Sequence, residues 1–206
     1  MRHNPPFAGV CFAAVLALAP VAHAQGPAPQ SPAEAPAGTY VIDPAHSKIT
    51  WSVSHFGFST YVGQFAGVAA TLKLDPKALD STDLQVTVNT ASLGTLNSAL
   101  DEHLKSPEFL DAAKFPQATF RATSVKRTGE TSADITGDLT LHGVTKPVVI
   151  HATFNQAGVN FIDHKYSLGF AGAAVLKRSE FGIKTYSPAI GEDVTLQIEA
   201  EFKAAS

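Results

Sequence analysis

Eight segments of this chain alternate apolar and polar residues with a period of two, and this repeat constrains the fold more than any other feature. In the first segment, Ile49, Trp51 and Val53 alternate with small polar residues. Successive side chains of a strand point to opposite faces, so each row predicts a strand with one buried face. The segments are residues 49–53, 68–74, 84–88, 118–122, 135–141, 148–154, 168–176 and 194–202. We therefore expect an all-β protein.

One interval between these segments has a different pattern. Leu96, Leu100 and Leu104 recur at a spacing of four, and Ser106 is followed by a proline, as at the start of a helix. We expect two short helices within 96–114, between the third and fourth strands. No helix of crossover length is predicted between the other strands, which favours antiparallel neighbours. Eight such strands close into a barrel, which removes exposed edges, with the helices as a lid.

The N-terminal residues have the features of an export signal. A basic start precedes the apolar run 7–19 and an Ala-His-Ala sequence, which together predict a signal peptide over 1–24, cleaved after Ala24. Residues 25–38 are rich in proline and alanine and predict a disordered linker. The barrel should span 39–206. The single cysteine, Cys11, lies in the signal, so the exported domain must be stabilised by its core without disulfides.

The charge balance argues against a nucleic-acid partner, and the hydropathy of the chain after the signal argues against a membrane-spanning segment. The chain has 15 Lys and Arg against 18 Asp and Glu, a balance unsuited to nucleic acid. After the signal, no apolar run approaches 18 residues, so we expect no integral membrane segment in the mature chain.

In an antiparallel barrel, odd-numbered strands end at the same rim. The inward row of the first strand continues to His55, and that of the seventh continues to Arg178. Both should lie at one helix-covered mouth. Arg178 either pairs with Glu180 or Asp193, or binds an oxygen of a bound molecule. The candidate mouth and lid residues are His55, Phe58, Leu100, His103, Leu104, Phe109, Arg178 and Phe181.

The inward rows contain several small residues, including Ala118 and Ala174, which indicates an interior that is not completely filled. A barrel of eight strands either packs its interior or holds one small ligand. The residues expected to line an apolar lumen are Trp51, Val53, Leu72, Val86, Phe120, Leu139, Ile150, Phe154, Phe170, Leu176, Leu196 and Ile198.

Catalytic signatures such as G-x-S-x-G and H-E-x-x-H are absent from the sequence. His55, His103 and His142 all fall at strand ends near the predicted mouth, where they would be the candidates for a metal site. Scattered single histidines are more often structural, so we expect neither a metal nor an enzyme.

Several ordered motifs resemble the YceI-like family of exported polyisoprenoid-binding proteins. They are 40–47 (YVIDPAHS), His55, 62–65 (VGQF), 103–106 (HLKS), 115–116 (FP) with Thr119 and Phe120, 137–148 (GDLTLHGVTKPV) and 178–183 (RSEFGI). The resemblance covers residues 39–203. It implies a lipocalin-like barrel in the bacterial periplasm that holds an isoprenoid lipid, such as a quinone or a polyprenyl phosphate. It implies no catalytic residues and no cofactor besides that lipid.

Three functions remain open at this point. The first is non-catalytic binding, carriage or storage of an isoprenoid lipid. The second is an enzyme that acts on a lipid head group through a rim histidine or a metal. The third is a stress-related scaffold with a filled barrel. The sequence also leaves a homodimer possible.

Overall fold

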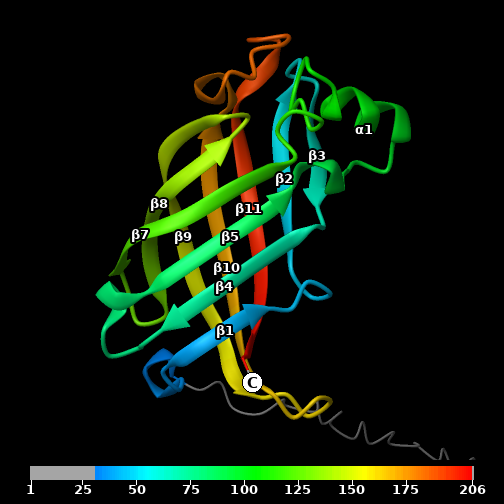
Figure 1. The fold of residues 1–206 in the computed structure, drawn as a ribbon. Coiled ribbons are helices and arrows are strands. Elements are labelled where there is room, and N and C mark those ends of the chain that lie inside the picture. Colours follow the sequence, from blue (N-terminus) through cyan, green and yellow to red (C-terminus); the bar gives the residue numbers. More distant parts are fainter. Residues whose placement is uncertain (1–30, 206) are drawn as a thin grey trace, which may run out of the picture.

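A computed structural model describes residues 31–205 of the chain, so the signal peptide predicted for 1–24 lies outside the described residues. These residues form a tall barrel with one short helix at its side (Figure 1). The strands are β1 (Gly38–Ile42), β2 (Lys48–His55), β3 (Ser59–Phe65), β4 (Val68–Leu74), β5 (Asp83–Asn89), β6 (Leu93–Gly94), β7 (Gln117–Arg127), β8 (Ser132–Leu141), β9 (Val144–Val159), β10 (Tyr166–Lys177) and β11 (Ile190–Ala204).

The strands close into an eight-stranded antiparallel barrel, which confirms the predicted fold class. The sheet runs β1-β4-β5-β7-β8-β9-β10-β11, and pairing of β1 with β11 closes it. Beyond β1, the strand β11 continues along β2, and β2 pairs with β3. Residues 38–55 therefore form one barrel strand in two pieces, and residues 59–74 form its neighbour in two pieces.

The break between β1 and β2 is a short outward loop that is tied to β11. Ile42 pairs with Phe202 and Ile49 with Ile198, so the loop inserts residues that β11 does not match. The hydroxyl of buried Ser47 accepts a hydrogen bond of 2.9 Å from the Glu201 amide. This bond holds β2 in line with β1 despite the insertion.

The third strand is interrupted as well, and it ends at an incomplete edge. β5 pairs with β7, but β6 has only two residues and pairs only with β3 among the described strands. Toward this end of the barrel the segment between β6 and β7 therefore replaces a full strand, and helix α1 (Ser98–Lys105) lies there in contact with β6 (Figure 1).

Only one of the two predicted helices forms. α1 starts after Asn97, whose side chain accepts the Leu100 amide at 3.2 Å. The helix predicted after Ser106 is wrong. The Ser106 carbonyl accepts the amides of Phe109 and Asp111 in consecutive turns, and Asp111 has a left-handed φ of 45° that reverses the chain. Local turn bonds therefore replace the expected helical ladder.

The end of the barrel farthest from α1 contains the main cluster of buried apolar residues, and we call it the base. Its core contains Leu168, which is fully buried, and Tyr40, whose hydroxyl donates to the Pro36 carbonyl at 2.6 Å. The disordered linker expected for 25–38 stays a prediction, and its described part contains one short turn. Ser31 caps a 3-10 turn, Pro32–Glu34, and Ala35 is buried in the core of the base.

No helix among residues 31–205 is both long and apolar enough to cross a membrane.

Candidate functional site

The barrel encloses two adjoining cavities. The upper chamber, of about 390 Å³, lies at the mouth, which is the end formed by the β2–β3 turn, α1 and residues 178–189. The lower chamber, of about 240 Å³, extends toward the base. Together they fall within the range of about 300–1,000 Å³ typical of ligand pockets. The two chambers share five lining residues, which we call the waist: Ile49, Val88, Ala118, Leu139 and Leu196.

Every residue predicted for the lumen lines one or both chambers. Trp51, Val53 and Leu176 line the upper one, and Leu139 and Leu196 line both. The others line the lower chamber: Leu72, Val86, Phe120, Ile150, Phe154, Phe170 and Ile198. The period-two rows therefore placed the inner face of the wall correctly, and the role of these residues in binding a ligand stays a prediction.

The lower chamber also has lining residues that sequence reasoning missed. Ile42 comes from β1, and Pro32 and Ala35 come from the segment assigned to the linker. Tyr40 and Ile42 are two positions apart, but Val41 between them is also apolar, so no period of two is visible in the sequence. The short apolar run Tyr40–Ile42, directly after the proline-rich segment, was the only sequence feature that could have indicated this strand.

Trp51 forms a flat wall of the upper chamber because its neighbour is a glycine. It pairs with Gly63 across β2 and β3. A Cβ atom at Gly63 would overlap the Trp51 indole, 2.5 Å from Cε2 and 3.0 Å from Nε1. The indole therefore lies across the β3 backbone, and the Trp51 ring centroid is 6.5 Å from that of Tyr61.

Three aromatic rings join the segments that cover the mouth. His103 of α1 makes an edge contact with Phe109, their centroids 5.0 Å apart, and Phe109 lies 6.2 Å from Tyr186. The Thr185 hydroxyl also donates to the Glu108 carbonyl at 2.5 Å. Helix α1 and residues 178–189 are thus linked, and together they form the lid. Leu100 and Leu104 of α1 line the chamber below, as predicted.

His55 and Arg178 do meet at the mouth, since both line the upper chamber. The guanidinium of Arg178, however, forms neither of the predicted ion pairs with Glu180 and Asp193, and binding of a ligand oxygen stays a prediction. Its Nε donates to Gly191 at 2.9 Å, Nη1 to Ile183 at 3.1 Å and Thr185 at 2.8 Å, and Nη2 to Ile190 at 2.9 Å, in each case to the backbone carbonyl.

Arg178 is therefore the centre around which the lid segment folds. Burial lowers the pKa of its guanidinium from the ordinary value, and only 6% of the residue is exposed. Arg178 donors already bound to four carbonyls are poorly available to a ligand. The period-two row of the seventh predicted strand placed Arg178 at the mouth correctly. That repeat carries no information on the loop that folds around its side chain.

Two predicted mouth residues lie outside the lumen. Phe58 is 91% exposed on the β2–β3 turn, and Phe181 is 1% exposed beneath the lid. The Phe181 carbonyl accepts a hydrogen bond of 3.0 Å from Nδ1 of His142. His142 packs against the Phe115 ring and does not line either chamber. Within residues 31–205, His55, His103 and His142 do not form a group that could hold a metal.

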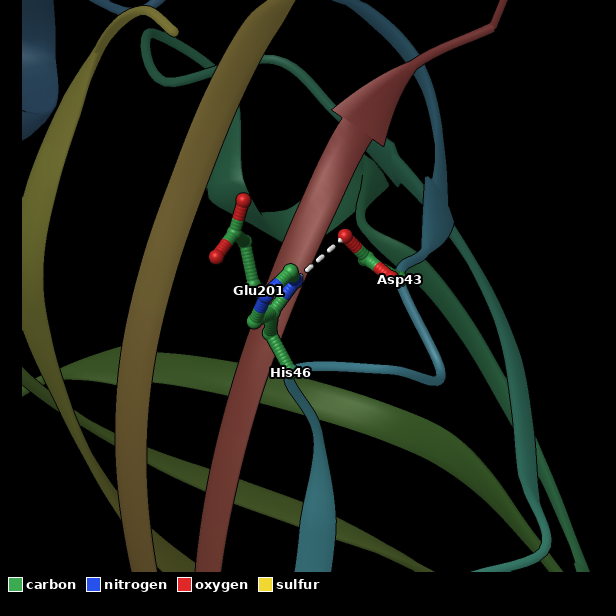
Figure 2. A group of neighbouring side chains, drawn as sticks. All are labelled: Asp43, His46 and Glu201. Carbon is green, nitrogen blue, oxygen red and sulfur yellow. Dashed lines mark hydrogen bonds and ion pairs between the residues drawn. The ribbon is translucent and has the colours of Figure 1, made fainter. Parts of the chain in front are cut away.

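A different cluster of polar side chains lies at the β1–β2 break, outside the lumen. Asp43, His46 and Glu201 each offer a ligand atom within 4.8 Å of the others (Figure 2). Oδ2 of Asp43 already accepts hydrogen bonds of 2.8 Å from His46 and 2.8 Å from Lys203. Lys203 also contacts Asp163 at 2.6 Å. The ammonium group supplies the positive charge that a metal would bring, so this cluster is a structural ion-pair network.

This network gives the protein a pH-dependent contribution to stability. The hydrogen bond from Lys203, and then that from His46, lower the pKa of Asp43 well below its usual range. A carboxyl group with a lowered folded pKa stabilises the protein above its unfolded pKa of about 3.9, and this stabilisation is lost as the pH falls through the folded pKa.

We therefore expect Lys203→Met to lower the free energy of unfolding at pH 7, with the difference from wild type shrinking well below pH ~4. Urea titrations across that range measure this difference. Lys73→Met, at an exposed position on β4, is the matched control and should change little. A deficit of Lys203→Met that stays constant into acid would show that lost packing, and not the charge, is responsible.

Comparison with known proteins supports one family. The model of the YceI-like domain matches residues 40–202. A UPF0312 protein of Pseudomonas savastanoi pv. phaseolicola is 42% identical over 182 residues, covering 87% of this chain and 93% of the relative. A UPF0312 protein of Pseudomonas fluorescens is 41% identical over 167 residues, covering 80% and 86%.

Solved structures show the same fold. The YCEI protein of Campylobacter jejuni matches with a TM-score of 0.67 and 30% identity, over 74% of this chain and 90% of that one. BcnA of Burkholderia cenocepacia matches with a TM-score of 0.71 and 24% identity, over 78% and 98%. A polyisoprenoid binding domain from Saccharophagus degradans matches with a TM-score of 0.63 and 14% identity, over 81% and 98%. The chain therefore belongs to the YceI-like family.

Proposed function

We propose that this protein binds an isoprenoid lipid, a quinone or a polyprenyl phosphate, and carries or stores it in the periplasm without catalysis. The observation that carries the proposal is the two-chambered apolar lumen, whose upper chamber lies at the mouth. A polyisoprenoid binding domain of the same fold supports the ligand class. The predicted signal peptide supports the location.

The chain of such a lipid supplies enough binding energy without special contacts. Burial contributes about 0.8 kcal/mol per CH₂ group. Burying most of a long isoprenoid tail would nominally approach the practical affinity limit of about −18 to −21 kcal/mol, so ordering costs must offset much of it. The walls of the lumen therefore need only present apolar side chains to an unfilled space, as the lining of both chambers does.

The head group should lie in the upper chamber beside His55, His103 and Tyr186. These side chains line the chamber at its mouth and carry ring N–H or hydroxyl groups suited to a quinone carbonyl or a phosphate oxygen. Arg178 is the weaker candidate because its donors are bound to the lid backbone.

The alternative of a scaffold with a filled barrel disagrees with the two chambers. A lipid enzyme is separated from a carrier by product analysis. The carrier should return its lipid chemically unchanged.

The proposal is tested on protein purified without detergent. Organic extraction followed by mass spectrometry should release an isoprenoid. Delipidated protein should take up added ubiquinone, and the quinone should quench the fluorescence of Trp51, the single tryptophan, because this residue lines the upper chamber. Protein that is repeatedly lipid-free and leaves Trp51 unquenched by quinone would contradict the proposal.

A further inference from the structure

The mouth carries large apolar side chains that the protein leaves in water. Phe56 and Phe58 lie on the β2–β3 turn, Leu96 precedes α1, and Tyr186 lies in the lid segment. Phe58 is 91% exposed and Leu96 is fully exposed. The Phe56 amide donates to the Ala189 carbonyl at 2.9 Å, which joins the β2–β3 turn to the lid segment, and Leu96 directly precedes Asn97, the N-cap of α1 (Figure 1). We call these four residues the rim.

Three rim residues also have an unfavourable backbone conformation. Phe56, Leu96 and Tyr186 have left-handed φ values of 53°, 64° and 57°. This region is uncommon for bulky residues, whereas Gly, Asn or Asp adopt it readily. Gly57, next to Phe56, has a φ of 73° and pays no such cost. Folding alone would favour small polar residues at these positions, so the apolar side chains indicate a binding role.

The rim is continuous with the lumen. Phe56 and Tyr186 line the upper chamber and are also about half exposed, at 49% and 56%. One apolar surface therefore runs from the outside of the mouth to the chamber wall. An apolar ligand that enters or leaves by the mouth can stay in contact with this surface and is not exposed to solvent on the way.

The charged groups near the rim argue against electrostatic attraction to an acidic surface. Lys177 is paired with Asp193 at 2.9 Å, and Lys105 with Glu102 at 3.4 Å. Glu108 is also exposed beside His103. Lys184 of the lid segment is exposed and has no ion pair among the described residues, but Glu102, Glu108 and Asp193 leave no excess of positive charge at this end. Contact must therefore rely on apolar insertion. This suits the interface of a zwitterionic bilayer, where isolated aromatic and leucine side chains anchor peripheral proteins.

We propose that the rim docks the mouth onto a phospholipid bilayer, so that lipid passes directly between the membrane and the lumen. This inference rests on the proposed function, because it gives the lipid its source. The matching apolar tip at the base, Phe161 and Ile162, is 83% and 76% exposed, but neither residue lines a chamber or has a left-handed φ. It therefore serves as the control.

The test is flotation of the protein with vesicles of phosphatidylcholine and phosphatidylethanolamine. Wild-type protein should float, and ~1 M salt, where the screening length is about 3 Å, should not release it. Leu96→Asn should reduce the vesicle-bound fraction at least tenfold, about 1.4 kcal/mol. Adding Phe58→Ser should reduce it further. The pair Phe161→Ser and Ile162→Ser should leave it unchanged.

Two further readouts separate docking from folding and from lipid binding. Leu96→Asn should unfold at a higher denaturant concentration than wild type, because asparagine accepts the left-handed backbone. Its uptake of ubiquinone from detergent micelles should equal that of wild type.

Wild-type protein that fails to float, or that salt releases, overturns the docking proposal. The docking proposal also fails if the Phe161 and Ile162 variant loses vesicle binding and Leu96→Asn does not. It fails as well if the protein is a dimer in solution that Leu96→Asn dissociates, because the rim would then bind a second copy of the chain. If wild-type protein also takes up no quinone from micelles, the proposed function itself fails. Uptake from micelles without flotation refutes docking alone.

Discussion

Leu196→Asp should abolish uptake of ubiquinone while the barrel still folds. Leu196 lies at the waist and lines both chambers, so a carboxylate there stands in the path of any chain that occupies the lumen. Contact between hydrocarbon and an unpaired charge is strongly unfavourable, and the charge keeps water in the lumen. We expect a loss of at least a hundredfold in quinone affinity, about 2.7 kcal/mol, measured by quenching of Trp51.

The matched control is Val175→Asp on the neighbouring strand. Val175 pairs with Thr195, the residue next to Leu196, but it is 61% exposed on the outer face. This variant should bind quinone as wild type does. If Leu196→Asp folds, as judged by circular dichroism, and still binds normally, the lumen is not the lipid site.

Arg178→Met should cost much of the protein's stability even in the absence of ligand. The variant removes the donors of four backbone carbonyls, in the lid and at the start of β11. Each buried acceptor left unsatisfied costs about 1–3 kcal/mol, and part of this is recovered when the segment opens to water. We expect a loss of about 3 kcal/mol or more in the free energy of unfolding, measured by urea denaturation.

The control for Arg178→Met is Arg121→Met, because the Arg121 side chain is 69% exposed and its nearest Asp83 oxygen is 3.9 Å away. This exposed pair should contribute little. Arg178→Lys keeps the charge but cannot reach four carbonyls, so it should remain unstable. If ligand-free Arg178→Met is as stable as wild type and only loses affinity, Arg178 binds the ligand and not the lid.

The inner face of the barrel could be predicted from the sequence because burial imposes a strict period. Trp51 and Leu196 are far apart in the chain, yet the inward position of each was predicted from the period-two repeat alone. The structure pairs them across β2 and β11. The shared mouth of His55 and Arg178 follows from counting antiparallel strands. These predictions depend on the repeat of the strand backbone, which a sequence displays directly.

The rest depended on interactions that no repeat encodes. The split strands were missed because the break at 43–47 is stabilised by Ser47, which bonds to Glu201 on a distant strand. The second helix was wrongly expected because Asp111 reverses the chain in a left-handed conformation, which the spacing of apolar residues does not reveal. The role of Arg178 was missed because its partners are carbonyls, which every residue has.

The two-residue strand β6 has a consequence for how the barrel moves. Of β3, only Gln64 and Phe65 pair with it, and β2 alone holds the remaining residues of β3 within the described sheet. Slow amide exchange should therefore characterise β9 and β10, and fast exchange the segment from Ser59 to Val62. Separation of the wall along this edge of β3 would break few ladder hydrogen bonds, and it would widen the entry for a bulky head group.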